Sequence, residues 1–420
     1  MSYKIPRGTL DLLPDTTTKW QWVEEKARQI SRRYGFSEVR TPIFETTELF
    51  QRGVGETTDI VEKEMYTFLD RKKRSLTLRP EGTAGIVRSF VENKVYAQPQ
   101  PTKWFYMGPM FRYERPQAGR QRQFHQFGLE AFGSTNPALD AEVIAMGMQF
   151  FEELGLQGVR VEINSVGDAE CRPVYLQKLI EYFEPYKDQL AADAQARLYR
   201  NPLRILDTKD PATKEIANQA PSILDHLNED CAHHFEMVKK YLDALGINYV
   251  VNDRLVRGLD YYTHTAFEFM LDVKGAQAST IGGGGRYNGL VQEIGGPEMS
   301  GIGFGIGLER VVLALDEQNV SLPIDKGVDC YVISIGEEAK VTGFQLLQDL
   351  RKAGFTGDQD YLNRKMKAQL KQADRVQARW VAILGEDELK EGKVNLKNLG
   401  TGTQELVPLA EVVTYLRNNK

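Results

Sequence analysis

The sequence has 420 residues, 41% of them hydrophobic and 26% charged, with a formal net charge of −5. This length exceeds what one hydrophobic core usually organises, and the composition is that of an ordinary soluble protein, so we expect two or three folded domains and exclude a largely disordered chain. The longest apolar stretch, residues 301–315, contains Glu309 and Arg310, which excludes a membrane-spanning helix of the usual ~20 apolar residues.

The cysteines are too few and too far apart in the sequence for a disulfide framework. There are three, an odd number: Cys171, Cys231 and Cys330. Such usage is typical of a protein kept in a reducing compartment. The start of the chain also lacks the apolar stretch, followed by small residues, that a secretory signal needs. We therefore expect a cytoplasmic protein without a membrane partner.

One short segment contains residue types that bind zinc. Its members are His226, Cys231, His233 and His234. No second pair of cysteines accompanies them and the surrounding pattern is helical, so the spacing does not match a structural zinc site. We expect solvated or packed side chains here, and no metal held by the protein.

The first third of the chain predicts a helix followed by extended segments. Apolar residues at helical spacing predict a helix over residues 17–34, which Gly35 ends. β-branched residues predict a strand over residues 36–44, where Pro42 favours a sheet edge. Two strand pairs are expected next: residues 65–69 with 75–79 around a basic tip, and residues 104–113 with 123–132 around a polar loop.

The middle of the chain is expected to hold a helical insertion between strands of one sheet. Residues 171–225 are rich in Ala, Gln, Lys and Asp and are broken by several prolines, which predicts short helices. Strand signals return at residues 248–251, 266–271 and 280–281, and a glycine-containing strand leads into a helix over residues 301–315. The predicted fold class is α+β, an antiparallel sheet core with flanking helices.

After residue 322 the pattern is that of a small α/β domain. The expected elements are a strand over residues 328–335, helices over 339–353 and 364–377, a strand over 380–384 and a helix over 409–416. On the second helix, five basic side chains at helical spacing would share one face: Arg364, Lys367, Lys371, Arg375 and Arg379. A solvated surface and a nucleic-acid contact both explain such a face.

Two glycine-rich runs invite a nucleotide-binding interpretation, but neither matches a common template. Residues 282–285 are all glycine, and residues 301–307 carry glycine at every second position. GxGxxG is absent from the second run and GxxxxGK[ST] from the whole chain, which disfavours dinucleotide and P-loop folds. Alternate glycines leave one face of a strand bare, so either tight packing or a ligand lying on the sheet explains them.

The second strand pair is expected to present one polar face. Because successive side chains alternate between faces, Arg112 shares a side with Gly108 and Met110. The residues that share a face on the partner strand are Phe124, Gln126, Gly128 and Glu130. This combination indicates a polar ligand pocket; the alternative is a solvent-facing sheet surface.

Five segments, which follow one another along the chain in the order typical of one enzyme family, resemble the motifs of that family. Residues 106–133 (YMGPMFRYERPQAGRQRQFHQFGLEAFG) resemble motif 2 of class II aminoacyl-tRNA synthetases, in the form typical of bacterial histidyl-tRNA synthetases. Residues 34–44 and 303–311 resemble motifs 1 and 3 of that class. Residues 255–262 (LVRGLDYY) and 283–290 (GGGRYNGL) resemble the two histidine-specific signatures. The class I signatures HIGH and KMSKS do not occur in the sequence.

The resemblance implies a division of the chain and an activity. It implies a class II catalytic domain over residues 1–322, with a helical insertion at about 171–225, and an anticodon-binding domain over residues 326–420. The implied enzyme is a histidine-tRNA ligase, which uses ATP to form histidyl-adenylate and pyrophosphate and then transfers histidine to the 3′ end of its tRNA. Because the transition state concentrates negative charge on the phosphoryl oxygens, fixed cations are the expected catalytic device.

Three arginines match the catalytic positions of the family. Arg112 is expected to grip the α-phosphate, where a planar guanidinium suits bidentate contact. Arg257 is expected to bridge the histidine carboxylate and the α-phosphate, and Arg310 to lie against the adenine and the γ-phosphate. The rest of the implied ATP-binding set, for hydrogen bonding, phosphate contact and stacking, is Glu114, Arg120 and Phe124.

Histidine selection needs an acceptor and a donor, because a neutral imidazole offers one N–H and one lone pair. By family position Glu130 supplies the acceptor and the Tyr262 hydroxyl the donor. The other residues implied to bind histidine, besides Arg112 and Arg257, are Glu81, Gly82, Thr83, Gln126, Tyr261 and Tyr287. A site that hydrogen-bonds its substrate rejects analogues lacking those groups by ~10⁴ to 10⁵, so no editing domain is expected.

The resemblance also implies partners. Mg²⁺ accompanies ATP as a charge partner of the phosphates, a second copy of the chain completes a homodimer with motif 1 at the interface, and the tRNA acceptor stem contacts the loop over residues 114–122. One segment departs from the family pattern: residues 356–361 are more polar than the middle strand expected there, which leaves the length of that strand open.

Two alternatives come from other classes. The histidine-sensing regulatory subunit of ATP phosphoribosyltransferase shares the catalytic fold, but it normally lacks the anticodon domain and has eroded motifs. Histidine-dependent ATP–pyrophosphate exchange would separate it from an enzyme. A nucleic-acid-binding module that uses only the basic tail is the second alternative, and RNA binding by a truncation ending at Leu322 would address it.

Overall fold

The computed structural model describes residues 3–55, 58–256, 259–272, 280–323 and 327–419. The chain divides into two compact units, an N-terminal unit, Met1–Leu322, and a C-terminal unit, Pro323–Lys420. Among the described helices, none is both long and apolar enough to cross a bilayer.

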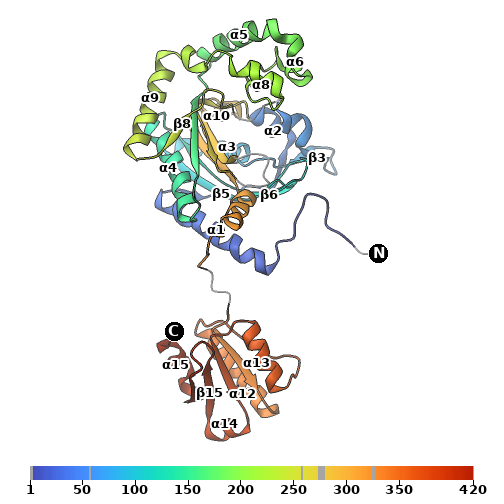
Figure 1. Cartoon of the computed structure of the whole chain (residues 1–420), viewed down its shortest axis with the longest axis vertical. Helices are drawn as coiled ribbons and strands as arrows, with labels where there is room; N and C mark the ends of the chain where they lie inside the picture. Colours follow the sequence, from blue (N-terminus) through green and yellow to red (C-terminus); the bar gives the residue numbers. More distant parts are fainter. Residues whose placement is uncertain (1–2, 56–57, 257–258, 273–279, 324–326, 420) are drawn as a thin grey trace. The chain divides into compact units, whose positions relative to one another are not determined.

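An eight-stranded sheet forms the centre of the N-terminal unit (Figure 1). In spatial order its strands are β1 (Ser37–Glu38), β5 (Thr102–Phe111), β6 (Gln123–Phe132), β11 (Gly301–Gly307), β10 (Thr280–Tyr287), β9 (Thr263–Met270), β7 (Arg160–Ser165) and β8 (Tyr249–Val251). Neighbours are antiparallel except for β1 with β5 and β7 with β8. The predicted mainly antiparallel core is therefore confirmed.

Alternation along the strands gives the sheet one apolar face and one largely polar face. Phe127 and Leu129 of β6 belong to the largest apolar cluster. The helices that cover this cluster are α1 (Pro14–Arg33), α4 (Pro137–Glu153), α9 (Glu229–Ala244) and α11 (Leu308–Glu317). On the other face, α3 (Thr83–Glu92) and α10 (Leu290–Glu293) pack against a second apolar cluster that includes Phe132, and polar side chains such as Gln126 and Glu130 lie beside it.

A three-stranded sheet lies in the same unit, in the order β2 (Phe44–Thr46), β4 (Ser75–Leu78) and β3 (Tyr66–Leu69). The predicted hairpin is confirmed, and its basic tip turns on Asp70, whose side chain accepts the N–H groups of Lys72 and Arg74 at 2.8 and 2.9 Å. Helix α2 (Thr47–Val54), the π-helix η1 (Ile60–Glu64) and the short η2 (Val95–Ala97) complete this region.

The single strand predicted over residues 36–44 is wrong. Residues 37–38 pair with β5 in the large sheet, whereas residues 44–46 pair with β4 in the small one. Pro42 lies between the two pairings and has no N–H to donate to either sheet. A pattern of β-branched residues cannot show that a strand changes partners in the middle.

The predicted helical insertion forms a layer of its own, coloured green in Figure 1. Its elements are α5 (Cys171–Phe183), η3 (Glu184–Gln189), α6 (Ala192–Arg197), α7 (Leu203–Leu206), α8 (Pro211–Asn218) and η4 (Ile223–His226). Tyr175, Leu179 and Phe183 contribute to a separate apolar cluster inside it. The insertion therefore carries its own small core.

The C-terminal unit is built on a five-stranded sheet. In spatial order its strands are β13 (Gly357–Gln359), β12 (Cys330–Ser334), β14 (Trp380–Leu384), β15 (Lys393–Asn398) and β16 (Gln404–Pro408). Its helices are α12 (Glu337–Lys352), α13 (Met366–Arg375), α14 (Glu386–Glu391), η5 (Leu409–Glu411) and α15 (Val412–Asn418). The polar segment forms a three-residue strand at the sheet edge, not a middle strand, because only β12 pairs with it.

The basic face predicted for this unit needs correction. Helix α13 begins at Met366 and ends at Arg375, so Arg364 and Arg379 lie outside it. Arg364 pairs with Asp360, with 3.3 Å between Nη1 and Oδ1. The prediction placed five cations on one helical face because charge spacing alone does not define where a helix starts.

Candidate active site

Two cavities meet on the polar face of the eight-stranded sheet. The smaller encloses about 70 Å³ and the larger about 840 Å³. Arg112, Gly283 and Gly305 line both of them. Arg112 therefore lies where the two cavities join, directly after the end of β5.

Most of the residues predicted to bind histidine line the smaller cavity: Glu81, Thr83, Arg112, Gln126, Glu130, Tyr261, Tyr262 and Tyr287. Strand β6 contributes Gln126 and Glu130, as the alternation of its side chains predicts. Arg257, predicted at the same site, lies outside the described residues.

The glycines of β11 serve two purposes. A Cβ atom at Gly303 would lie 2.0 Å from Oε2 of Glu130, and one at Gly301 would lie 2.2 Å from the Tyr287 ring. These two positions must be glycine because side chains from neighbouring strands fill the space. At Gly305 the nearest atom, on Gln126, would be 3.5 Å away, and at Gly307 none of the described atoms would lie within 4 Å. Those positions leave the sheet open to a ligand, so both explanations left open by the sequence apply.

Glu130 is the central titratable group of the smaller cavity. It is 1% exposed, and its carboxyl oxygens accept hydrogen bonds from Oγ1 of Thr83 at 2.7 Å and from the Tyr287 hydroxyl. Burial raises the pKa of Glu130 to about 8, although the Tyr287 and Thr83 donors oppose this shift. In the ligand-free protein, burial therefore favours the protonated form of this carboxyl over the charged form.

The smaller cavity also offers acceptors for a cation. Oε1 of Gln126 is buried and has no hydrogen-bond partner among the described residues. Glu81 lies nearby, its two oxygens held at 2.7 and 2.9 Å by the N–H groups of Thr83 and Ala84. A buried oxygen without a partner is unfavourable unless a ligand completes it, and an ammonium group has the required donors.

Gly82 leaves space for the ring of Tyr106. Gly82 does not line the cavity, but a Cβ there would lie 2.1 Å from the Tyr106 ring, and one at Gly128 would lie 2.3 Å from it. Both glycines thus make room for Tyr106, which does line the cavity. Tyr106 was not among the predicted site residues, although its strand parity with Gly108 and Arg112 could have indicated it.

The larger cavity collects the predicted ATP-binding residues: Arg112, Glu114, Arg120, Phe124 and Arg310. Nε of Arg112 donates to the Pro80 carbonyl at 2.7 Å, and its guanidinium carbon lies 5.4 Å from the Phe124 ring centroid. Glu114 lies between two arginines, 3.8 Å from Nη1 of Arg112 and 3.4 Å from Nη1 of Arg120. These contacts hold the guanidinium of Arg112 in place before any ligand binds.

Arg310 reaches the same cavity from α11 and donates to the Thr280 carbonyl. Burial and the neighbouring Arg120 lower the pKa of Arg310 to about 10. It remains a cation at neutral pH and is one of four arginines that line this cavity, with Arg112, Arg120 and Arg254, an arrangement that suits a polyphosphate.

Other lining residues were not predicted. Glu268 of β9 lies opposite Gly283, and its Oε2 accepts from Oγ1 of Thr280 at 2.9 Å. Lys209 and Lys214 reach the larger cavity from the helical insertion. The predicted strand over residues 266–271 could have indicated Glu268 by parity, but no sequence signal shows that an insertion returns to the sheet.

The histidines of the segment considered for zinc make ordinary structural contacts. Nδ1 of His226 lies 2.9 Å from the Ser222 carbonyl, and Nε2 of His234 lies 3.2 Å from Oδ1 of Asp140. Within the described residues, a different group has ligand atoms close enough for a metal: Asp168, Cys171 and Cys231. It lies outside both cavities.

Comparison with known proteins agrees with this geometry. The family described as Histidyl-tRNA synthetase matches residues 8–311, and the family described as Anticodon binding domain matches residues 329–419. The chain is 57% identical to the histidine–tRNA ligase of Anoxybacillus flavithermus, over 100% of this chain and 99% of the relative. It is 58% identical to the histidine–tRNA ligase of Geobacillus sp. strain WCH70, over 99% of each.

A solved structure is similar over the same length. The apo histidyl-tRNA synthetase of S. aureus superposes with a TM-score of 0.86 at 44% identity, covering 99% of this chain and 100% of that one. Both family matches, the relatives and this structure agree along the whole sequence. The chain belongs to the histidyl-tRNA synthetase family.

Proposed function

We propose that this chain is a histidine-tRNA ligase that activates histidine with ATP and then transfers it to the 3′ end of its tRNA. One observation carries the proposal: Arg112 lines both cavities. A carboxylate in the smaller cavity and a triphosphate in the larger one would meet at its guanidinium. A fixed cation at that point stabilises the charge that develops on the α-phosphate as pyrophosphate leaves.

In the smaller cavity, histidine would direct its imidazole to Glu130 and its ammonium group to Gln126 and Glu81. The donors around Glu130 orient its carboxyl, so one imidazole nitrogen meets a fixed partner. Tyr262 and Tyr261 line the same cavity, and the Tyr262 hydroxyl is proposed to serve the second nitrogen. Arg257 is proposed to bridge the two substrates, by family position alone.

In the larger cavity, Phe124 would stack on the adenine and Glu114 would hydrogen-bond it, while Arg120 and Arg310 would contact the phosphates. Carboxylates of Glu114, Glu162 and Glu268 line this cavity and are hard oxygen ligands of the kind that Mg²⁺ accepts. Mg²⁺ bound with ATP would neutralise part of the phosphate charge. The arginines would hold the reacting phosphate whether or not Mg²⁺ is bound.

Histidine-dependent ATP–pyrophosphate exchange tests the proposal, followed by charging of the tRNA for histidine. Exchange that requires histidine, and charging that requires both substrates, are the expected results. A histidine-sensing regulatory subunit would bind histidine and show no exchange. That result would refute the proposal and favour the regulatory alternative.

Replacing Glu130 with glutamine should raise the KM for histidine by roughly 10- to 150-fold, because a hydrogen bond from the imidazole to a charged carboxylate is exchanged for one to a neutral amide. The KM for ATP should change much less, since Glu130 does not line the larger cavity. Pyrophosphate exchange at varied histidine and varied ATP measures both constants. An unchanged histidine KM would remove Glu130 from the imidazole site.

We also propose that the chain forms a homodimer through the three-stranded sheet. Apolar side chains there are unusually exposed: Ile43 (44%), Phe44 (46%), Phe68 (43%) and Leu69 (65%). Phe44 and Phe68 share one face of this sheet, with ring centroids 6.3 Å apart, and exposed apolar side chains of this kind are typical of a surface that another chain covers.

Phe68→Glu should therefore shift the protein from dimer to monomer in sedimentation-velocity experiments, because a charge would be buried at the interface. Phe344→Glu is the matched control, since Phe344 is 47% exposed and belongs to the C-terminal unit. A monomeric wild type, or equal effects of the two variants, would argue against this interface.

We further propose that residues 1–322 are the catalytic domain and residues 326–420 the anticodon-binding domain, and that the enzyme works in the cytoplasm. In the C-terminal unit a cavity of about 840 Å³ is lined by Tyr361, Met366, Arg364 and Lys365. Tyr361 is 61% exposed. An exposed ring beside cations is a stacking site for an RNA base.

A further inference from the structure

Two thiols lie side by side where the helical insertion joins the sheet. Cys171 is the first residue of α5, and Cys231 lies in the first turn of α9. Their sulfur atoms and a carboxyl oxygen of Asp168 all lie within 4.8 Å of one another. Both cysteines are free, with exposures of 6% for Cys171 and 0% for Cys231. A bond between them would join the two ends of the insertion.

Both side-chain oxygens of Asp168 already accept hydrogen bonds. Its Oδ1 accepts the N–H groups of Glu170 and Cys171, each at 2.9 Å, and its Oδ2 accepts from Nδ2 of Asn228 at 2.9 Å. Although burial opposes ionisation, these donors lower the pKa of Asp168 far below its ordinary value. A metal would have to displace them, and two sulfurs alone fall short of the four ligands of a zinc site. The pair is better suited to sulfur–sulfur chemistry.

The two thiols have different surroundings. The backbone N–H of Asp168 donates to Sγ of Cys171 at 3.3 Å, and Cys171 is 6% exposed whereas Cys231 is 0% exposed. Burial raises the pKa of Cys231 well above its ordinary value, and the nearby Cys171 and Asp168 raise it further. Cys171 is therefore the thiol that reacts first, and Cys231 the one that follows.

We propose that Cys171 and Cys231 are an oxidisable pair that a peroxide converts into a disulfide. The Cys171 thiolate attacks one peroxide oxygen and becomes a sulfenic acid, while the other oxygen leaves as hydroxide and takes up a proton to form water. Sγ of Cys231 then attacks the sulfenic sulfur, loses its proton, and a second water leaves. In total two thiols and one hydrogen peroxide give one disulfide and two waters.

Hydrogen bonds connect this pair to the smaller cavity. Arg172 follows Cys171; its Nε donates to the Val166 carbonyl at 3.0 Å and its Nη2 donates to the Tyr262 carbonyl. Across the same junction, the N–H of His264 donates to the Gly167 carbonyl at 2.8 Å. Sγ of Cys171 also packs closely against Gly167, since a Cβ at Gly167 would lie only 2.6 Å from it. Through these contacts, a shift of Cys171 towards Cys231 would move the backbone of Tyr262.

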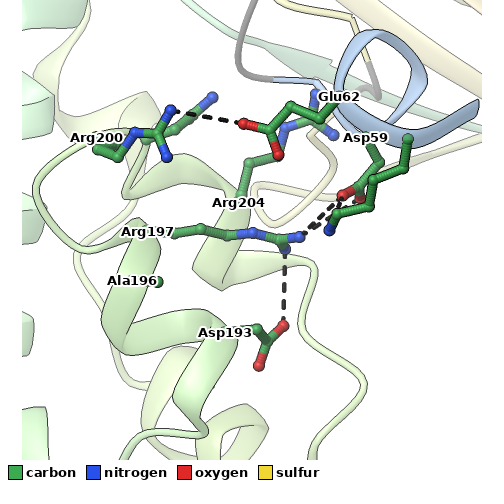
Figure 2. Close-up of a pocket in the computed structure, with 9 residues that line it drawn as sticks. Asp59, Glu62, Asp193, Ala196, Arg197, Arg200 and Arg204 are labelled. Atoms are coloured by element: carbon green, nitrogen blue, oxygen red, sulfur yellow. Dashed lines mark hydrogen bonds and ion pairs between the residues drawn. The ribbon is translucent and has the colours of Figure 1, made fainter.

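At its far end the insertion contacts the rest of the unit through polar side chains. Arg197 lies 3.4 Å from Asp59, and Arg200 lies 3.5 Å from Glu62 of η1 (Figure 2). Arg204 and Asn201 both reach Oδ1 of Asp260, at 3.4 and 3.3 Å. Partly exposed ion pairs are individually weak, so a covalent bond at the junction with the sheet would add a stronger constraint. A disulfide there would fix that junction. This part of the inference rests on the proposed function, because its readout is the histidine site.

The test treats the full-length protein with hydrogen peroxide and maps its thiols by mass spectrometry without reduction. We expect loss of two of the three free thiols, a cross-link between the peptides that contain Cys171 and Cys231, and reversal by dithiothreitol. Cys330→Ser, in the other unit, should form the same cross-link. In the Cys231→Ser variant, oxidation of Cys171 should stop at the sulfenic acid, which dimedone would trap.

Kinetics separate the two parts of the inference. Oxidised wild type and oxidised Cys330→Ser should show a raised histidine KM and little change in ATP KM, whereas Cys171→Ser should not respond to peroxide. If the peptides that contain Cys171 and Cys231 stayed reduced after peroxide treatment, the proposal of an oxidisable pair would be refuted. A disulfide with an unchanged histidine KM would overturn the coupling to the site. Absence of pyrophosphate exchange before oxidation would count against the proposed function and leave the cross-link mapping valid.

Discussion

Replacing Asp140 with alanine is expected to lower the free energy of unfolding of the N-terminal unit by about 3–5 kcal/mol. Asp140 and Arg286 are both 0% exposed, and Nε of Arg286 donates to the two Asp140 oxygens at 3.1 and 3.2 Å. Without the carboxylate, the guanidinium would remain buried and uncompensated. The pair joins α4 to β10, so its loss should loosen the strand that carries Tyr287.

Urea unfolding, followed by hydrogen exchange of peptides from α4 and β10, would measure this loss in the N-terminal unit alone. Asp316→Ala is the control, because the Lys19–Asp316 pair is solvent-exposed and should contribute about 0–1 kcal/mol. Asp140→Leu combined with Arg286→Met should be less destabilising than the sum of the single changes, since no charge is left buried. A loss below about 1 kcal/mol for Asp140→Ala would mean that the pair is solvated.

The same pair has a pH signature. Burial opposes ionisation of Asp140, but Arg286 and His234 outweigh it and lower the pKa to about 2 from the ordinary 3.8. A lowered carboxyl pKa stabilises the folded state above the unfolded pKa, and this contribution is lost as the pH falls through the folded pKa. The difference in stability between wild type and Asp140→Ala should therefore be constant above about pH 5 and shrink as the pH approaches 2.

Strand alternation is the part of the site that the sequence predicts best. Gln126 and Glu130 share a face of β6 because the period of two is fixed by backbone geometry, whatever packs around the strand. Arg112, one residue beyond the end of β5, follows the same alternation, and the register of β5 places Gly108 opposite Gln126. A local rule thus identified three residues of a site built from distant segments.

Alternation along one strand does not predict which side chains meet across different strands. One of the two hydroxyls that donate to Glu130 belongs to Tyr287, on a strand that is not adjacent to β6. Gly303, on the strand between them, allows this contact because it has no Cβ. Sheet order and register decide both facts, and they depend on pairings between residues far apart in the sequence.

Local sequence patterns also fail to predict how the insertion packs and where helix α13 ends. Lys209 and Lys214 reach the larger cavity only because the insertion packs back towards the sheet, and polar composition carries no information about that docking. Helix α13 stops at Arg375 and leaves Arg379 outside, although the spacing of the basic residues continues. A periodic charge pattern constrains a face only where the backbone is helical, so the tertiary structure must define the helix first.

Replacing Arg112 with alanine is expected to lower the rate of histidine-dependent pyrophosphate exchange by ~10² to 10³, equivalent to about 2.7–4 kcal/mol of transition-state stabilisation. The guanidinium is oriented by Pro80, Phe124 and Glu114 before substrates bind. It therefore needs no reorganisation when charge develops on the α-phosphate. Transfer of histidine from preformed adenylate to tRNA should lose much less, because that step does not expel pyrophosphate.

The half-reactions can be compared by rapid quench, with Arg71→Ala as the control, since Arg71 lies at the exposed tip of the β3–β4 hairpin. Arg112→Lys should recover only part of the exchange rate, because an ammonium group cannot make the bidentate contact of a guanidinium. If the ATP KM rose while the exchange rate at saturation stayed unchanged, Arg112 would bind ground state and transition state equally. Its place between the two cavities would then serve binding alone, and the charge stabilisation would have to come from Arg310 and Arg120.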